Sequence, residues 1–453
     1  MKPKLLLLVL FCFSYFSNAQ VDFEAHIIVE NHPDVFGVYN LTAADIDGDG
    51  DIDLVATSTD GNKIVWFENT DGQGNFSAPK VIESDMEYPL EIAVADLNGN
   101  GYLDLVAVST FDNQVVWFEN LDGLGNFGPQ QTVASLYGAQ TVKAKDINGD
   151  GYIDIIAGGD NKVIWIENTD GLGNFGTPKI ISNAIGTTES IEVGDIDGDG
   201  DMDVVVADYD LNTISWYENT DGLGNFGAAQ LIHDEVDAAL SVVLKDLNND
   251  GNLDVISDYQ NGSIAWFEND GQGDFGSANV IGSNLGLIFK LFAADLTGDG
   301  NNDIIASEWV QHELIWFQNT GNGNFENKNI ISSAYQNPVG VIAADFNGDG
   351  KMDVAACFRG LDQIIWFENK GPLSIANNTS NKFTIYPNPT KDFLNIVATS
   401  SISEVKIFNP MGQLVLTAKN TSEIDIAALG KGIYLVYLKT EDNQVGVEKI
   451  IKK

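Results

Sequence analysis

Short apolar runs rich in β-branched and aromatic side chains alternate with polar turns along most of the chain. The runs at residues 54–56, 64–69 and 79–82 follow one aspartate-rich turn, and the run at 92–95 leads into the next. None of these runs has helical spacing. Runs of this length bounded by turn residues predict β-strands. We therefore expect an all-β fold made from units of four short strands.

The aspartate-rich turn is a nine-residue motif that recurs seven times, reading DIDGDGDID in the first copy and DLNGNGYLD in the second. The copies begin at residues 45, 96, 146, 195, 246, 295 and 345, so successive starts lie 49–51 residues apart. Seven repeated four-stranded units predict a seven-bladed β-propeller over residues 20–370. The alternative is a nearly linear stack, which would leave two open ends that need caps, and the sequence offers none.

The last unit lacks its own fourth strand. An Asn-Phe or Asp-Phe pair introduces the fourth run of the first six units, whereas the seventh unit ends its aromatic run at Asn369. Residues 22–30 have the same spacing between a phenylalanine and a pair of apolar residues. We expect this stretch to supply the outer strand of the last blade and so to close the ring.

Seven tryptophans occupy one register position in the aromatic runs. They could serve as platforms for stacking sugars, but their apolar neighbours are typical of strands buried on both faces. We therefore expect them in the core. They are Trp66, Trp117, Trp165, Trp216, Trp266, Trp316 and Trp366.

Oxygen-bearing side chains stand at the first, third, fifth and ninth positions of each motif, and the seventh residue, such as Asp51, offers its carbonyl, so a tight loop can direct these oxygens to one cation. The intervening glycines allow the backbone angles of such a loop. Six to eight oxygen ligands suit calcium, whereas zinc would require His or Cys, which the motifs lack. The predicted Ca²⁺ ligands are Asp45, Asp47, Asp49, Asp51, Asp53, Asp96, Asn98, Asn100, Asp104, Asp146, Asn148, Asp150, Asp154, Asp195, Asp197, Asp199, Asp203, Asp246, Asn248, Asp250, Asp254, Asp295, Thr297, Asp299, Asp303, Asp345, Asn347, Asp349 and Asp353.

The copies differ in carboxylate count, and more carboxylates raise calcium affinity. We expect the loops at Asp45 and Asp195 to bind most tightly and the loop at Asp295, which has Thr297 at its third position, to bind most weakly. The competing interpretation is a set of Asp-Gly turns without metal. The Gly-rich turn at residues 71–76 and its copies could hold a second ion, but Gly and Asn are also what a plain hairpin turn requires.

The first 19 residues predict a secretory signal peptide, with a basic start, a short apolar run and small residues before Gln20. A membrane anchor is the alternative, but the run is too short to span the bilayer, and no other segment is long and apolar enough. Beyond this segment Cys357 is the remaining cysteine. An internal disulfide is therefore excluded, and packing or metal must hold the protein together.

The charge is unevenly distributed. Residues 21–370 hold 59 acidic and 12 basic side chains, a formal charge of −47. Such a surface argues against nucleic acid as a partner of this region. It also opposes compaction unless cations lie among the carboxylates.

The recurring pattern D-x-[DN]-G-[DN]-G-x-x-D between two strands resembles the FG-GAP/VCBS repeat, the calcium-binding propeller repeat of integrin α-subunits and of some lectins and polysaccharide lyases. The resemblance covers about residues 21–370. It implies that aspartates at the first, third, fifth and ninth positions bind calcium. The family's Phe-Gly-Gly-Ala-Pro-like stretch is only loosely matched around Phe175, so integrin-like ligand specificity is not implied.

Residues 382–453 resemble a type IX secretion C-terminal sorting domain, and residues 371–381 read as a polar linker. The matching stretches include 386–390, 405–413 and 429–434. The alternating apolar and polar residues predict a small β-sandwich. The resemblance implies export by the type IX machinery to the outer-membrane surface, or the surroundings, of a Gram-negative bacterium.

The fold does not fix a function. The connections opposite the calcium loops vary most between repeats, and such loops usually carry recognition. Our candidate ligand-binding residues there are Tyr88, Tyr137, His233, Trp309, His312, Tyr335 and Arg359. We therefore expect a binding module for a glycan or a surface protein, and a purely structural surface component also remains open.

A polysaccharide lyase is the alternative function. A lyase needs a positioned acid and base, with a cation or arginine to neutralise a uronate. Of the histidines after the signal segment, His233 and His312 lie in candidate loops, two repeats apart, and Arg359 is the sole arginine. The sequence does not show an acid–base pair, so we name no catalytic residue.

Overall fold

The structure is a computed structural model that describes residues 21–234, 239–259, 262–372, 383–398, 400–409, 414–419, 421–440 and 445–453. The predicted signal peptide and nearly all of the predicted linker lie outside these residues. The chain divides into a larger compact unit, Gln20–Pro372, and a smaller C-terminal one. No helix among the described residues is long and apolar enough to cross a membrane.

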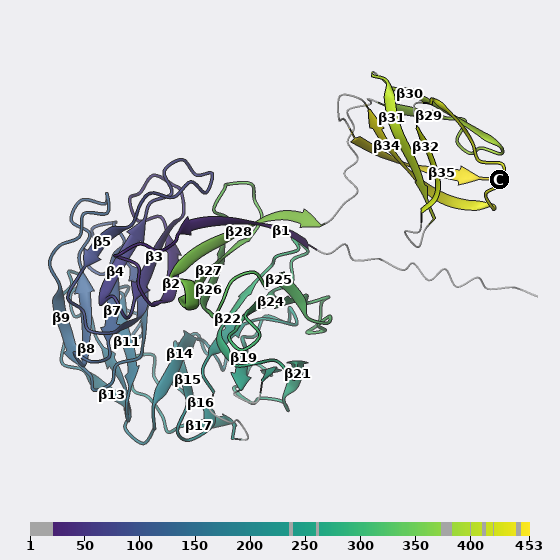
Figure 1. Cartoon of the computed structure of the whole chain (residues 1–453). Coiled ribbons are helices and arrows are strands. Elements are labelled where there is room, and N and C mark those ends of the chain that lie inside the picture. The colour runs from purple at the N-terminus through teal and green to yellow at the C-terminus, as the bar shows by residue number, and fades with distance from the viewer. Residues whose placement is uncertain are drawn as a thin grey trace, which may run out of the picture. The chain divides into compact units, whose positions relative to one another are not determined.

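The larger unit consists of seven four-stranded antiparallel sheets, numbered here in chain order. Each of the first six sheets takes four consecutive strands, and the seventh takes three strands and β1 (Figure 1). The strands are, for sheet 1, β2 (Val38–Ala44), β3 (Asp53–Ser58), β4 (Lys63–Phe67) and β5 (Lys80–Glu83); for sheet 2, β6 (Pro89–Ala95), β7 (Asp104–Ser109), β8 (Gln114–Phe118) and β9 (Gln131–Ser135); for sheet 3, β10 (Thr141–Lys145), β11 (Asp154–Gly159), β12 (Lys162–Ile166) and β13 (Lys179–Ser182); for sheet 4, β14 (Thr188–Gly194), β15 (Asp203–Asp208), β16 (Thr213–Tyr217) and β17 (Gln230–His233); for sheet 5, β18 (Val242–Lys245), β19 (Asp254–Tyr259), β20 (Ser263–Phe267) and β21 (Asn279–Gly282); for sheet 6, β22 (Ile288–Ala294), β23 (Asp303–Glu308), β24 (Glu313–Phe317) and β25 (Asn329–Ser332); and for sheet 7, β26 (Pro338–Ala344), β27 (Asp353–Phe358), β28 (Gln363–Pro372) and β1 (Val21–Val29).

The seven sheets form a closed ring. The first strand of each sheet contacts the first strand of the next, and β26 contacts β2. Every residue of the second strand β3 is buried, because neighbouring sheets cover both of its faces. The seven register tryptophans are 1–5% exposed, so they belong to the core and not to a sugar-stacking surface. The predicted all-β propeller is confirmed.

Strand β1 fills the fourth position of sheet 7 by pairing antiparallel with β28 (Figure 1). The pairing runs from Val21 opposite Pro372 to Val29 opposite Ile364. The ring of His26 stacks on Trp366 with centroids 4.5 Å apart. Because β28 continues to Pro372, the predicted linker start at residue 371 is two residues too early.

The fourth strands also begin later than the Asn-Phe pair predicts. Phe76 forms an isolated bridge with Asn69, and β5 starts four residues further along. The equivalent phenylalanines of the next five repeats form the same bridge. The pair therefore marks the end of the Gly-rich turn, not the start of the strand.

An asparagine at the end of each third strand links its sheet to the preceding one. Asn120, in sheet 2, donates from Nδ2 to the main-chain oxygen of Ile46, in sheet 1, at 2.9 Å. Asn69, in sheet 1, donates in the same way to Phe346, in sheet 7, at 2.8 Å. All seven asparagines make this bond, at 2.7–2.9 Å, so one hydrogen bond joins every neighbouring pair and closes the ring.

A glycine of each Gly-rich turn lets the sheets approach closely. Gly125 has φ +72°, and a Cβ atom there would lie 2.3 Å from the ring of Trp66 in the preceding sheet. Gly74 stands in the same relation to Trp366, across the closure of the ring. The repeated glycine is therefore required both by the left-handed backbone and by the neighbouring tryptophan.

Charged side chains join the first strands around the axis of the ring. Glu91 lies with Oε1 3.1 Å from Nζ of Lys290 and 3.4 Å from Nζ of Lys143, and its Oε2 accepts hydrogen bonds from Thr141 Oγ1 and Val142 N. Lys143 also pairs with Glu192 at 3.2 Å. Burial opposes the charge of Glu91, but the two ammonium groups outweigh it and lower the pKa of the carboxyl to about 2. Sheets 2, 3, 4 and 6 are thereby connected across the axis.

The smaller unit has two antiparallel sheets around one apolar core. One sheet contains β29 (Phe383–Tyr386), β30 (Phe393–Ala398) and β33 (Glu423–Asp425). The other contains β31 (Ile402–Phe408), β32 (Leu414–Lys419), β34 (Gly432–Thr440) and β35 (Val445–Lys452). Leu394, Val405 and Val436 are fully buried between them. The expected C-terminal β domain is confirmed.

Replacing an inter-sheet asparagine should destabilise the ring. Asn120→Ala leaves the buried carbonyl of Ile46 without its donor, which should cost about 2 kcal/mol or more. Asn126→Ala, in the exposed part of the adjacent turn, is the control and should cost well under 1 kcal/mol. Denaturant unfolding monitored by tryptophan fluorescence measures both, and equal midpoints would refute the role of the inter-sheet bond.

Glu91 should make stability depend on acid. Its folded-state pKa of about 2 lies below the unfolded value of 4.5, so its stabilisation is present above pH 4.5 and is lost as pH falls towards 2. At pH 7, Glu91→Gln should lower the free energy of unfolding by about 2–4 kcal/mol, because Lys290 loses its carboxylate partner and Lys143 keeps only Glu192. The difference in the free energy of unfolding between Glu91→Gln and the unmodified protein should become smaller below pH 4.5, as measured by denaturant titrations. A difference that stays constant down to pH 3 would contradict this, and the exposed variant Glu87→Gln provides the control.

Candidate functional site

The seven aspartate-rich loops connect the first and second strands of their sheets, so all lie on one face of the ring. In the first loop Asp45 Oδ1 accepts hydrogen bonds from Gly48 N and Asp49 N, and Oδ2 accepts one from Gly50 N. Gly48 and Gly50 have φ values of +75° and +96°, which other residues rarely adopt. The first aspartate therefore fixes the loop conformation through the loop's own amides.

The ninth aspartate is buried beneath the loop. Asp53 Oδ2 accepts a hydrogen bond from Ile46 N at 3.1 Å, and Oδ1 accepts one from Asn69 N at 2.7 Å. Burial raises the pKa of the carboxyl to about 7, although the two amides favour the charged form. The ninth aspartates of the other repeats are held alike, with pKa values raised to about 6 or 7. Among the described residues no lysine or arginine pairs with any of the seven carboxylates.

Ligand atoms gather most tightly in two loops. Carboxylate oxygens of Asp45, Asp47 and Asp53 lie within 4.8 Å of one another, as do those of the first, third and fifth residues of the fourth loop, at 195, 197 and 199. Asp47 Oδ1 is also buried without a hydrogen-bond partner among the described residues. An unpartnered buried oxygen beside two further carboxylates fits a hard divalent cation, which takes oxygen ligands.

Other loops satisfy their oxygens internally. The amide of Asn148 donates to Asp150 Oδ2 at 2.9 Å, and Asn248 in the fifth loop donates to the fifth-position aspartate in the same way. In the seventh loop, Lys351 Nζ lies 2.5 Å from Asp349 Oδ2. In these loops a side chain of the protein already bonds to one of the carboxylates that would bind a cation.

The Gly-rich turns share this face, and their geometry is that of a self-contained hairpin turn. Asp71 Oδ1 accepts a hydrogen bond from Gln73 N, and Oδ2 accepts one from Asn75 Nδ2. The equivalent aspartates of the next three repeats accept the same bonds. The carboxylates are thus used within the turn, which favours the plain-turn interpretation over a second ion site.

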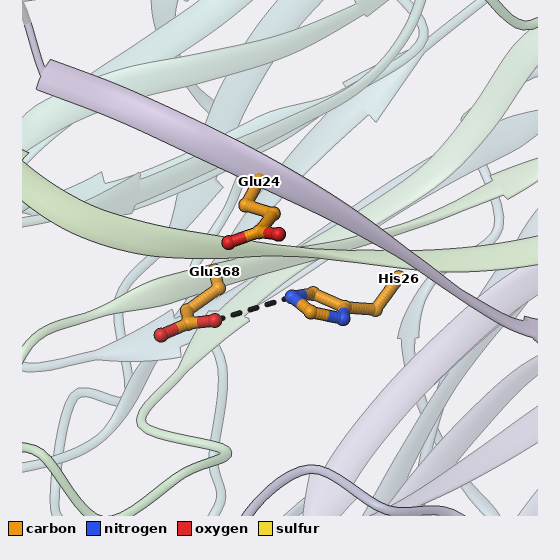
Figure 2. Close-up of side chains that lie close together, drawn as sticks. All are labelled: Glu24, His26 and Glu368. Carbon is orange, nitrogen blue, oxygen red and sulfur yellow. Dashed lines mark hydrogen bonds and ion pairs between the residues drawn. The ribbon is translucent and has the colours of Figure 1, made fainter. Parts of the chain in front are cut away.

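A third cluster, which the sequence analysis did not single out, lies where β1 meets β28. Figure 2 shows Glu24, His26 and Glu368 together, with His26 Nε2 bonded to Glu368 Oε2 at 3.1 Å. Lys370 Nζ lies 2.8 Å from Glu24 and 2.5 Å from Glu368. Lys370 pairs with both carboxylates, so the cluster is an ion-pair network that joins β1 to β28.

The structure does not bring the seven candidate ligand residues together into one site. Tyr137 is 70% exposed, Tyr88 stacks on Phe111, and His233 packs against Phe267. The Tyr335 ring packs against two core phenylalanines.

Two of the three remaining candidates, Arg359 and Trp309, contact aromatic residues at the axis of the ring. Arg359 Nη2 donates to both carboxylate oxygens of Asp60 at 2.8 Å, and the guanidinium carbon lies 5.9 Å from the centre of the Tyr39 ring. Trp309 contacts Phe289 with ring centroids 4.9 Å apart. His312 Nδ1 accepts a hydrogen bond from the main-chain N–H of residue 337 at 3.2 Å.

A pocket opens at the axis of the ring, at the ends of the first strands remote from the aspartate-rich loops. Its enclosed part is small, about 60 Å³, and the empty space rises to about 560 Å³ when the open mouth is included, so a ligand would sit in the mouth. Its outer lining takes one residue from each sheet, six positions before each motif. In sheet order these residues are Tyr39, Leu90, Gln140, Glu189, Leu240, Phe289 and Val339.

The outer ring of the pocket has two chemically different sides. Tyr39 and Phe289, in sheets 1 and 6, meet edge to face at 6.3 Å. Gln140 and Glu189, in sheets 3 and 4, stand on the other side of the ring of sheets. The next residues of the first strands form the inner lining, where Lys290 is bonded to the buried Glu91. The pocket therefore offers an aromatic wall opposite a polar one.

The sequence analysis missed this pocket, although a signal for it exists. The fifth and sixth positions before each motif lie near or just before the start of a largely apolar first strand, yet they carry Glu91, Gln140, Glu189 and Lys290. Within one repeat, a single polar residue in an apolar strand carries no clear signal. The polar residues are seen to form one lining only when the repeats are placed around a closed ring.

Similarity to solved structures supports the fold. A lectin from Agrocybe aegerita, solved to explain its recognition of non-reducing terminal N-acetylglucosamine, is 22% identical over 73% of this chain and 86% of its own, with a TM-score of 0.51. BBS1N in complex with ARL6DN, in a crystal soaked with lead, is 13% identical over 77% of this chain and 98% of its own, with a TM-score of 0.55. At these identities the likeness shows the fold alone. No curated protein sequence matches the chain.

Family comparisons account for both units. The FG-GAP-like repeat matches in six overlapping stretches, at residues 45–107, 96–157, 146–206, 195–257, 246–306 and 295–356. The secretion system C-terminal sorting domain matches residues 384–453, and this type IX sorting domain indicates a secreted or cell-surface protein. The chain therefore belongs to the family of FG-GAP-like repeat proteins, as a β-propeller that ends in a type IX sorting domain.

Proposed function

We propose that this protein is a calcium-binding propeller that recognises a glycan at the outer-membrane surface, or in the surroundings, of a Gram-negative bacterium. A signal peptide at residues 1–19 would direct it across the inner membrane. The sorting domain, with a boundary near residue 382, would then engage the type IX machinery. The residues from Gln20 to about 372 would form the binding unit.

Calcium is supported by the electrostatics of the loops. Among the described residues, the seven buried ninth-position carboxylates have no basic partner, and Asp47 Oδ1, which lies beside Asp45 and Asp53, has no hydrogen-bond partner. Divalent cations there would keep the carboxylates ionised and offset part of the −47 charge of residues 21–370. The first, third, fifth and ninth side chains of each loop would be the ligands. The loops at Asp45 and Asp195, with the tightest carboxylate clusters, would bind most strongly.

Glycan binding is supported above all by the two-sided pocket at the axis. The apolar face of a sugar ring can pack against an aromatic wall such as Tyr39 and Phe289. Its hydroxyl groups can bond to amide and carboxylate groups such as those of Gln140 and Glu189. The fold neighbour that is a lectin agrees with this use of the propeller.

Calcium should raise stability strongly, because an ion that binds only the folded state stabilises it by mass action, about 2.7 kcal/mol per site at one hundred times the dissociation constant. Excess chelator should therefore lower the melting temperature. Asp47→Asn should weaken the tightest calcium binding in isothermal titration calorimetry, whereas Asp71→Asn, in a self-satisfied turn, should leave it unchanged. Identical melting curves with and without chelator would contradict the calcium proposal.

A glycan array probed with the calcium-loaded protein tests the binding function. We expect a restricted set of glycans to bind, with Phe289→Ala reducing the binding at least tenfold because the aromatic wall is truncated. Leu124→Ala, at an exposed side chain in a Gly-rich turn on the opposite face, is the control. Absence of binding to every glycan would overturn the proposal, and a rise in ultraviolet absorbance with acidic polysaccharides would indicate a lyase instead.

A further inference from the structure

Glu189 is the unusual member of the pocket lining. It lies on β14 and is half-buried. Its side chain makes no hydrogen bond or ion pair within the part of the chain that the structure describes. Burial raises the pKa of its carboxyl to about 7, and the nearby carboxylates of Asp160 and Asp210 add to the shift. A partly buried carboxylate without a partner is costly, and a cationic or hydrogen-bond-donating ligand would relieve this cost.

The other charges at the axis compensate one another. Lys290 and Lys143 both pair with Glu91, and Lys143 also pairs with Glu192, so two ammonium groups balance two carboxylates. Among the charged residues lining the pocket, Glu91, Glu189 and Lys290, this leaves Glu189 without a counter-ion. The pocket thus has one uncompensated negative group at its polar wall.

The apolar part of the lining limits what can carry the cation. Leu240 and Leu90 flank the polar wall, and Tyr39 and Phe289 stand on the other side of the ring. A bare metal ion would leave these surfaces uncovered. A compact ring that carries an ammonium group and has an apolar face would satisfy both walls, because the ammonium would face the polar wall while the apolar face packs on the aromatic rings.

We propose that the axial pocket binds a sugar that carries a free primary amine, with the ammonium group against Glu189 and one face of the sugar ring against Tyr39 and Phe289. This proposal rests on the glycan-binding function and names its ligand class. Uronic acids and other acidic sugars are excluded, because they would bring a second carboxylate to Glu189 and approach a strongly negative domain. N-acetylation would remove the charge that Glu189 recognises.

Three methyl glycosides that differ at one position provide the test: those of glucosamine, N-acetylglucosamine and glucose. Each is titrated into the calcium-loaded chain by isothermal titration calorimetry at pH 7. The glucosamine glycoside should bind at least tenfold more tightly than the other two, as expected for a hydrogen bond to a charged group. Glu189→Gln should abolish this preference, while Glu87→Gln, an exposed carboxylate on the same face, should preserve it.

The melting temperature in calcium confirms that each variant is folded, so that lost binding reports on the pocket. Equal affinities for the three glycosides, or a preference that survives Glu189→Gln, would overturn the amine proposal. Nα-acetyl-lysine amide keeps its side-chain ammonium and represents a peptide. If it binds more tightly than the glucosamine glycoside, the amino-sugar proposal is overturned in favour of a peptide ligand. If Glu189→Gln still binds glycans on the array, the glycan-binding function holds without the amine proposal. If the unmodified protein binds no glycan on the array, both proposals are contradicted.

Discussion

The ring depends on a hydrogen bond from the asparagine at the end of each third strand to a carbonyl of the preceding sheet. The same asparagine donates its main-chain N–H to the buried ninth aspartate of its own repeat, as Asn69 does to Asp53. The same carboxylate also accepts a hydrogen bond from the main-chain N–H of the second loop residue, Ile46 in the first repeat. The carbonyl of that residue in turn accepts the hydrogen bond from the asparagine of the next sheet, Asn120. Each loop is therefore tied both to its own sheet and to the next one. The loop conformation and the closure of the ring therefore depend on the same hydrogen bonds.

This coupling explains why so acidic a protein adopts a compact fold. The ninth carboxylates must be buried to serve as acceptors, and burial raises their pKa values because, in the part of the chain that the structure describes, no basic side chain offsets the loss of water. A cation bound above them would stabilise the ionised form and, through the same amides, the contact with the neighbouring sheet. The proposed calcium ions would therefore act on the integrity of the ring, and only indirectly on the ligand pocket at its opposite end.

The sequence predicts the repeating architecture well because its determinants are local. The strand patterns, the regular spacing of the motif and the missing fourth strand after Asn369 can all be read directly along the chain. The bridge at Phe76 shows a limit, since the pair that seemed to begin a strand only ends a turn. The pairing of Glu91 with Lys290, 199 residues apart, depends on closure of the ring, so no local pattern reveals it. For the same reason our candidate ligand residues came from variable loops, while the pocket is lined by first-strand positions.

A crystal structure of the protein grown in calcium is the most direct test of the central claim, which is a closed ring of sheets whose aspartate-rich loops hold cations. The account predicts seven sheets joined through the asparagine bonds. It also predicts ions in at least the loops at Asp45 and Asp195, with oxygen ligands at about 2.3–2.6 Å. Loops without ions at saturating calcium, or sheets that do not close between β26 and β2, would contradict it.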